Sequence, residues 1–332
     1  LLPDVPGGSS QIGAIAFQPD GKAVLVGDFT PTGAPTSVHL VVRLTAAGAL
    51  DAAPGTGFGP TGFVKATMPV GGLWSQARDV AMQGDKVVVV GMMATTLSGF
   101  QIFVARYTAS GALDGGFGAG GYQLIGTAGE EEGMNVAVLP DQRIVVSGSG
   151  TRDGQDDLIL ARLTANGALD PSFGSGGIAE HDLTGRADGS RALARGADGK
   201  LLVGGYRAAA PGVPGEETQD ALVARFHANG ALDTTFDGDG WLAFDGLGDQ
   251  DWVEDVAVLA DGKVAAAVRV QASPANGGSA GQDFLLYVFR KSGSPDTTFG
   301  TTGRTRTDFA AGFDNLWAMD VQVDGKIVLG GD

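Results

Sequence analysis

Short apolar segments alternate with turns rich in Gly and Asp along almost the whole chain. The clearest run of them is MNVAVLP (134–140), RIVVSG (143–148), LILARLT (158–164) and IAEHDL (178–183). Segments of this length that are rich in Val, Leu and Ile and bounded by turn residues predict β-strands. The four segments therefore predict one antiparallel unit of four strands, with a tight turn at Asp141 and Gln142 between the first two.

Two phrases repeat along the chain. One is an apolar strand followed by a small-residue turn, an Asp, a Phe and a Gly-rich corner: LVVRLTAAGALD…FGPTG (40–62), FVARYTASGALDGGFGAGG (103–121), LILARLTANGALDPSFGSGG (158–177), LVARFHANGALDTTFDGDG (222–240) and LLYVFRKSGSPDTTFGTTG (285–303). The other is a pair of strands around an Asp-Gly-Lys turn, whose basic residue recurs at Lys22, Lys86, Arg143, Lys200, Lys263 and Lys326, at intervals of 57 to 64 residues. Four short strands repeated at this period predict an all-β fold, a β-propeller of four-stranded antiparallel blades.

These units resemble the delta-60 repeat, a bacterial β-propeller repeat of roughly sixty residues. The resemblance covers nearly the whole chain and rests on the Asp-Gly-Lys turn, the strand Arg, the Leu-Asp pair and the Phe-Gly corner together. It implies a propeller, often within an exported or surface protein, and implies little about ligand or activity. The first unit departs from the pattern by an insertion before Phe58, and the fifth has Val288 for the Arg and Pro295-Asp296 for Leu-Asp.

The repeats predict one domain that covers residues 1–332. Five units are complete, and the sixth ends after its second strand, GKIVLGGD (325–332). Residues 1–8, LLPDVPGG, align with the end of a fourth strand, so we expect them to complete the last blade. The expectation is a six-bladed ring whose last blade is incomplete and whose natural chain continues past Asp332. Because the sequence begins at Leu1 and not at Met, we also expect a removed secretion signal and a secreted, cell-surface or periplasmic location in a bacterium.

Composition narrows the classes of function. A net charge of −16 makes nucleic acid an unfavourable partner, since phosphate binding relies on Lys and Arg. No apolar run approaches the roughly 18 residues of a membrane-spanning helix, so we expect no membrane span. The absence of Cys excludes disulfides and thiolate chemistry. The three His residues lack zinc-ligand spacing, and no local motif of an enzyme is present.

Residues that recur in every unit are interpreted as scaffold. Four Arg residues each precede an Asp by eight positions, in the pairs Arg43 and Asp51, Arg106 and Asp114, Arg162 and Asp170, and Arg225 and Asp233. We expect them to clamp each blade to its corner, against the alternative of a ring of ligand-binding arginines. We expect Phe117, Phe173, Phe236 and Phe299 to be core residues rather than sugar platforms, and Asp237-Gly-Asp239-Gly240 to be a turn rather than a calcium loop.

The variable loops on the other face are the expected place for binding. Trp74, Trp252 and Trp317 fall where such loops lead into the first strand of a unit, and we predict them as a stacking surface. Asp249, Asp251 and Asp314 would supply hydrogen-bond acceptors or hold a cation, with calcium left open and no other cofactor expected. Ordinary solvated charges and indoles that fill the seams between blades are the alternatives.

The chain is therefore predicted to be a non-catalytic binding or surface-interaction module whose partner is a protein or glycan at the cell surface. Two other classes stay open. A glycan-acting hydrolase or lyase would need carboxylates that converge at the propeller tunnel. A structural subunit of an extracellular fibre or surface assembly would need a large apolar contact between copies.

Overall fold

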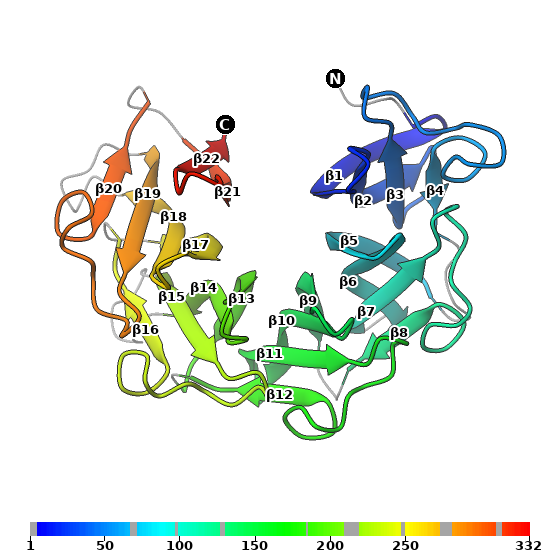
Figure 1. Cartoon of the computed structure of the whole chain (residues 1–332). Helices are drawn as coiled ribbons and strands as arrows, with labels where there is room; N and C mark the ends of the chain where they lie inside the picture. Colours follow the sequence, from blue (N-terminus) through cyan, green and yellow to red (C-terminus); the bar gives the residue numbers. More distant parts are fainter. Residues whose placement is uncertain are drawn as a thin grey trace. The chain divides into compact units, whose positions relative to one another are not determined.

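The computed structural model describes residues 5–66, 72–96, 99–126, 130–183, 185–208, 219–246, 250–272, 281–309 and 314–332. These residues form β-strands and turns, with no helix among them (Figure 1). In these ranges there is accordingly no helix with the length and apolar character to cross a membrane. The chain divides into two compact units, residues Leu1–Arg152 with Leu160–Pro171, and Asp153–Ile159 with Ser172–Asp332.

The first two sheets belong to the first unit and have four strands each in chain order. Their strands are β1 (Gly8–Phe17), β2 (Ala23–Pro31), β3 (Val38–Leu44) and β4 (Phe63–Lys65), then β5 (Trp74–Gln83), β6 (Lys86–Thr96), β7 (Gly99–Tyr107) and β8 (Tyr122–Ile125). The third sheet has the same order and contains β9 (Glu131–Val138), β10 (Ile144–Arg152), β11 (Gln155–Leu163) and β12 (Ile178–His181).

The remaining strands belong to the second unit. They are β13 (Asp188–Arg195), β14 (Leu201–Ala208), β15 (Gln219–Phe226) and β16 (Trp241–Phe244), then β17 (Gln250–Val258), β18 (Val264–Ala272), β19 (Gly281–Phe289) and β20 (Arg304–Thr307), then β21 (Leu316–Val321) and β22 (Ile327–Gly331). A single parallel bridge between Gln219 and Gln250 joins the first two of these sheets into one of eight strands. The last sheet has only two strands.

The prediction of an all-β chain with four-stranded antiparallel sheets is confirmed, and the strands expected around residues 134–183 lie within one or a few residues of β9 to β12. The six-bladed ring and the completion of its last blade by residues 1–8 stay predictions. Residues 1–4 are outside the described ranges. Val5 is buried against Leu25 and Leu40 in the cluster of the first sheet.

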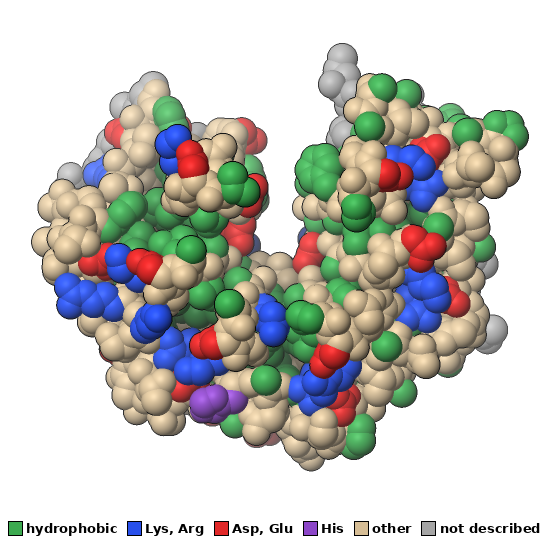
Figure 2. Space-filling model, viewed as in Figure 1, with side chains coloured by type: hydrophobic (Ala, Val, Ile, Leu, Met, Phe, Trp, Pro, Cys, Tyr) green, Lys and Arg blue, Asp and Glu red, His purple; other side chains and the backbone are tan. Residues whose placement is uncertain are grey.

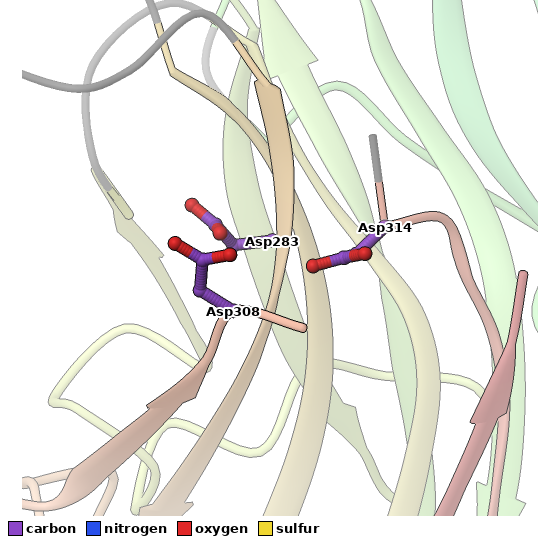
Figure 3. A group of neighbouring side chains, drawn as sticks. All are labelled: Asp283, Asp308 and Asp314. Carbon is purple, nitrogen blue, oxygen red and sulfur yellow. The ribbon is translucent and has the colours of Figure 1, made fainter. Parts of the chain in front are cut away.

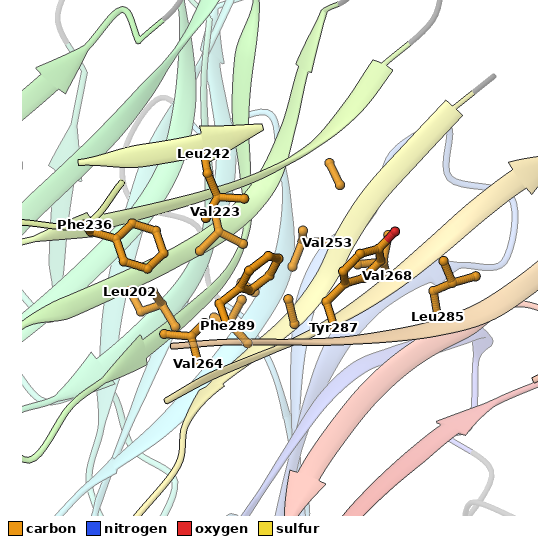
Figure 4. Packing of buried hydrophobic residues seen from close by; sticks show 14 of the residues in the cluster. Leu202, Val223, Phe236, Leu242, Val253, Val264, Val268, Leu285, Tyr287 and Phe289 are labelled. Atoms are coloured by element: carbon orange, nitrogen blue, oxygen red, sulfur yellow. The ribbon is translucent and has the colours of Figure 1, made fainter. Parts of the chain in front are cut away.

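The middle strands of the sheets are buried on both faces. In β6 the consecutive residues Val87, Val88, Val89 and Val90 are all fully buried, although neighbouring side chains of a strand point to opposite faces. The second unit has a corresponding cluster in which Leu202, Val223, Phe236, Val253 and Phe289 meet (Figure 4). Each such side chain contributes roughly 1.5–3 kcal/mol through removal from water. Apolar runs without polar alternation are therefore the signature of these central strands.

The turn between the first two strands of a unit requires a left-handed residue. Gly21 and Gly262 hold φ values of 82° and 80° there, a conformation that glycine adopts without steric cost. Gln142 occupies the same place with φ of 68°, which confirms the tight turn predicted at Asp141 and Gln142. The Asp141 carboxylate accepts the Arg143 backbone N–H at 3.2 Å and so supports this turn.

In three repeats the arginine of the third strand links its own repeat to the next one along the chain. Arg106 Nε donates to the Asp114 carboxylate at 2.8 Å, and its Nη1 donates to the backbone carbonyl of Ala165 in the following repeat at 2.5 Å. Its guanidinium also lies 4.6 Å from the ring centre of the buried Phe117. Two other arginines make the same three contacts. Arg43 makes them with Asp51, the Ala109 carbonyl and Phe58. Arg225 makes them with Asp233, the Lys291 carbonyl and Phe236. The scaffold interpretation of these arginines is confirmed.

The basic residue of the Asp-Gly-Lys turn joins the same carboxylate. Lys86 lies 2.8 Å from Asp114, and the corresponding pairs are Lys22 with Asp51, Arg143 with Asp170, Lys200 with Asp233 and Lys263 with Asp296. On the face drawn in Figure 2, basic and acidic side chains accordingly lie next to one another instead of in separate patches. In the fifth repeat Val288 replaces the arginine, and Asp296 keeps its Lys263 partner at 2.9 Å.

The first strand of every repeat contains a β-bulge, which the sequence pattern did not predict. The extra residue is the one at which the register with the second strand shifts, and it is Gly13, Arg78, Met134, Arg191, Glu254 or Trp317. A bulge bends its strand and re-aims the side chain of the extra residue. Six equivalent positions thus carry five different kinds of side chain, with arginine at two of them.

The corner carboxylates predict how stability depends on pH. Burial alone would raise the pKa of Asp233, but hydrogen bonds from Lys200, Thr235 and Arg225 outweigh it and hold the pKa well below its usual range. The same kind of contact with Lys263 and Thr298 lowers the pKa of Asp296 to about 2. A depressed pKa in the folded state stabilises the protein above the unfolded-state value of about 3.9, and this contribution is lost as the pH falls further.

Asp233→Asn should therefore lower the free energy of unfolding by roughly 2–4 kcal/mol at pH 6, and the deficit should shrink as the pH falls from about 4 to 2. Denaturant unfolding of both proteins across this pH range measures the difference. The exposed turn residue Asp85 provides a control, since Asp85→Asn should stay within about 0.5 kcal/mol at each pH. A deficit that is constant from pH 6 to pH 2 would contradict the assigned role of the carboxylate.

Candidate functional site

Two of the predicted tryptophans come together in the second unit around one arginine. Arg269 of β18 lies directly opposite Trp252 of β17, with its guanidinium carbon 4.6 Å from the centre of that indole. The same carbon lies 5.2 Å from the indole of Trp317 in β21. Trp252 is 9% exposed and Trp317 is 54% exposed, so the stack runs from the interior to the surface. Such cation–π contacts hold planar groups in a defined geometry.

A second arginine and one carboxylate complete this cluster. Arg191 of β13 lies 5.6 Å from the Trp252 indole centre, and Glu254 pairs with both Arg191 at 3.1 Å and Arg269 at 2.8 Å. Burial lowers the pKa of Arg269, and the positive charge of Arg191 lowers it further. The Glu254 carboxylate raises this pKa but does not outweigh the two other effects. Among the described residues, the Nε atoms of both arginines are buried without a hydrogen-bond partner. Unsatisfied buried donors are rare in folded proteins and call for an explanation other than stability.

Three members of this cluster occupy equivalent places in the repeat. They are the bulge residues of β13, β17 and β21, namely Arg191, Glu254 and Trp317. These three residues follow one another at intervals of 63 residues in the sequence. Sequence reasoning identified Trp317 by its residue type but missed both arginines and the role of Glu254. Alignment of the repeats was the available signal, because it shows that these three residues share one position four residues before the end of the first strand.

The three tryptophans lie within the first residues of first strands, in β5, β17 and β21, and not in the loops that lead into them. Trp252 donates its indole N–H to the Gln219 side chain, and Trp317 donates its indole N–H to the Asp332 carboxylate at 3.0 Å. Trp74 is the first residue of β5 in the other unit, where its ring centre lies 5.9 Å from that of Phe100.

The predicted aspartates are engaged in loop closure. Asp251 accepts the backbone N–H of Gly246 at 2.6 Å, and Asp314 accepts that of Phe309 at 2.8 Å. Asp188, at the equivalent position one repeat earlier, accepts the N–H of Leu183 at 3.0 Å. Each bond spans five residues and closes the loop that leads into a first strand. Asp249 lies outside the described residues.

Asp314 also belongs to a group of three carboxylates in the second unit (Figure 3). Asp283, Asp308 and Asp314 can each place one oxygen within 4.8 Å of the others, a set of ligands that hard cations accept. Asp283 is paired with Arg306 at 2.7 Å, and Asp314 closes its own loop. Two of the three carboxylates therefore have structural roles inside the protein, and we assign no cation to the group.

His39 is a residue of the protein core. His39 is fully buried, lies 2.8 Å from the Ser75 hydroxyl and 2.7 Å from the Tyr107 hydroxyl, and stacks on Phe103. Burial lowers its pKa to about 3, so the imidazole stays neutral at physiological pH. Its Ser and Tyr partners satisfy it within the core, which makes this a structural network.

Comparison with known proteins gives matches of fold and family. The model of a family described as a domain of unknown function (DUF5122) beta-propeller matches residues 18–53, 139–173 and 196–236. Each segment contains the turn between the first two strands (Asp-Gly in two of them, Asp141-Gln142 in the other), the third strand with its arginine and the corner aspartate. No curated protein matches the chain.

Several solved structures are similar in fold. A neuraminidase-like protein from A/bat/Guatemala/164/2009 has a TM-score of 0.50 at 7% identity, with 96% of this chain and 80% of that chain covered. A protein of unknown function from Dyadobacter fermentans has a TM-score of 0.47 at 14% identity, covering 88% and 85% of the two chains. An endo-arabinanase from Bacillus licheniformis has a TM-score of 0.40 at 12% identity, covering 76% and 92%. At these identities a structural likeness concerns the fold alone. The three segments matched by the family model are similar to repeats of a β-propeller family, in agreement with the four-stranded sheets.

Proposed function

We propose that the chain is a non-catalytic binding module, an exported bacterial propeller of the delta-60 kind, and that Trp317 stacks on a sugar ring of a surface glycan. The observation that carries this proposal is the exposed indole of Trp317 supported by Arg269 and Trp252. The Trp317 indole has 54% of its surface exposed to water, and a partner that covers this apolar surface gains free energy by removing it from water. The buried layers beneath it fix its orientation in advance, which lowers the entropy cost of binding.

The polar part of the cluster suits an oxygen-rich ligand. Arg191 and Glu254 lie beside the stack and belong to neighbouring first strands of the same unit. Ligand sites in proteins combine an aromatic or apolar surface with a few placed polar groups. A sugar ring has an apolar face for the indole and hydroxyl groups for such side chains.

Trp317→Ala should abolish glycan binding and leave the fold intact, because the indole is exposed and is not part of the described core. A glycan array identifies the ligand, and titration of the best glycan against intrinsic fluorescence measures the loss, expected to exceed roughly tenfold. Phe17→Ala is the matched control, since Phe17 is 70% exposed on β1 and outside this cluster. Retained binding by Trp317→Ala, or no bound glycan on the array, would overturn the site.

A glycan-acting hydrolase or lyase is the second candidate, favoured by the close approach of Asp283, Asp308 and Asp314. Glycoside hydrolysis uses two carboxyl groups, about 5–5.5 Å apart in retaining enzymes and roughly 6.5–9.5 Å apart in inverting ones. The binding proposal expects no new reducing ends or unsaturated products when bound glycans are incubated with the protein. Product formation that Asp308→Asn removes would establish the enzyme instead.

A further inference from the structure

A cavity of about 570 Å³ lies between the fourth and fifth repeats, within the second unit and away from Trp317. It is lined by residues that include Gly196, Lys200, Arg225, Leu259, Gly262 and Lys291. Sites for small molecules usually have volumes of roughly 300–1,000 Å³. The cavity therefore has the size of a ligand site, and it lies at the turns that carry the repeated phrases.

A glutamine side chain occupies the equivalent place in the first unit. The Gln83 amide nitrogen donates to the carbonyls of Gln142 and Ala165 at 2.7 and 3.1 Å. Its amide oxygen accepts a hydrogen bond from Arg106 Nη1 at 2.7 Å. All three polar requirements of this buried carboxamide are thus met by the seam between two repeats.

The second unit keeps these partners and lacks the glutamine. Arg225 Nη1 donates to the Lys291 carbonyl at 2.6 Å, as Arg106 does to that of Ala165. Gly262 takes the turn conformation of Gln142, with φ of 80° against 68°, and the same backbone bond to the residue three positions earlier.

Glycine is exceptional at this position of the repeat. The residue five places after the bulge is Gly196 in the fourth repeat, and in the others it is Gln18, Gln83, Leu139, Leu259 or Gln322. The cavity therefore exists because Gly196 has no side chain where the other repeats have a glutamine or leucine.

We propose that this cavity binds a primary carboxamide carried on a short aliphatic chain, as in glutamine or a glutamine side chain of a peptide. The carboxamide would take the place that Gln83 holds, with its NH₂ donating to the carbonyls of Gly262 and Lys291 and its oxygen accepting from Arg225. A carboxylate of the same shape has no proton to donate to the two carbonyls. A site whose carbonyl oxygens face the ligand's donors discriminates strongly between the two, because the carboxylate oxygen would face carbonyl oxygens with no proton between them.

The structure permits the cavity to be filled by substitution. A Cβ atom built on Gly196 would come within 2.6 Å of only one atom, the Asp198 carboxylate oxygen, which can move with its side chain. The backbone of Gly196 is also not left-handed, so a residue with a side chain can adopt its conformation. Gly196→Gln should therefore fold and place its own carboxamide in the cavity, and Gln83→Gly should open a matching cavity in the first unit.

The test compares the N-acetyl, N-methylamide derivatives of glutamine and glutamate, together with free L-glutamine, by saturation-transfer NMR and calorimetry. The wild-type protein should bind the glutamine derivative at least roughly tenfold more tightly than the glutamate derivative. Gly196→Gln should lose this binding, and its melting temperature should be at or above that of the wild type. Gln83→Gly should bind with twice the wild-type stoichiometry.

Each outcome decides the proposal. Binding of free glutamine alone would support a free amino acid as the source, and binding of the derivative alone would support a peptide side chain. Equal binding of the glutamate derivative, undiminished binding by Gly196→Gln, or no binding of either glutamine compound by the wild type would overturn it. Gly196→Gln is sufficient for this decision if Gln83→Gly does not fold.

Discussion

The contacts of the buried arginine in the third strand hold neighbouring repeats together in three of the repeats. Its guanidinium serves the corner aspartate of its own repeat, a backbone carbonyl of the next repeat and the face of a buried phenylalanine at once, as Arg106 shows. A planar group with five donors can meet all three, whereas an ammonium cannot. The charge is tolerated in the interior because the aspartate and the turn lysine form a closed group with it.

Variation between the repeats is concentrated at two positions of the first strand and the turn that follows it. The bulge residue of each first strand is one, and in the second unit it brings Arg191, Glu254 and Trp317 into one cluster. The residue five places further on is another, and there Gly196 opens a cavity that Gln83 closes in the first unit. Both candidate sites thus arise from single positions that differ between repeats on a common backbone.

The sequence predicted what recurs and missed what depends on register. Regular spacing located the strands and the turns, and the eight-residue separation of Arg106 and Asp114 predicted their ion pair. The bulges could not be predicted, because an extra residue in one strand leaves no local signal in an alternating pattern. The partnership of Trp252 with Arg269 required the pairing of β17 with β18. The sequence indicates Asp251 as a ligand because this residue lies in a variable acidic loop, and only the structure shows that its carboxylate accepts the Gly246 N–H and closes that loop.

The claim that the arginine couples neighbouring repeats is tested most directly by hydrogen exchange of Arg106→Gln, followed by mass spectrometry under native conditions. Local opening is expected to follow the loss of the contacts that hold each segment. The account predicts faster exchange both at the corner of residues 112–121 and at the turn of residues 164–168 in the following repeat, where Arg106 holds the Ala165 carbonyl. Faster exchange confined to residues 112–121, with the turn at 164–168 unchanged, would contradict it.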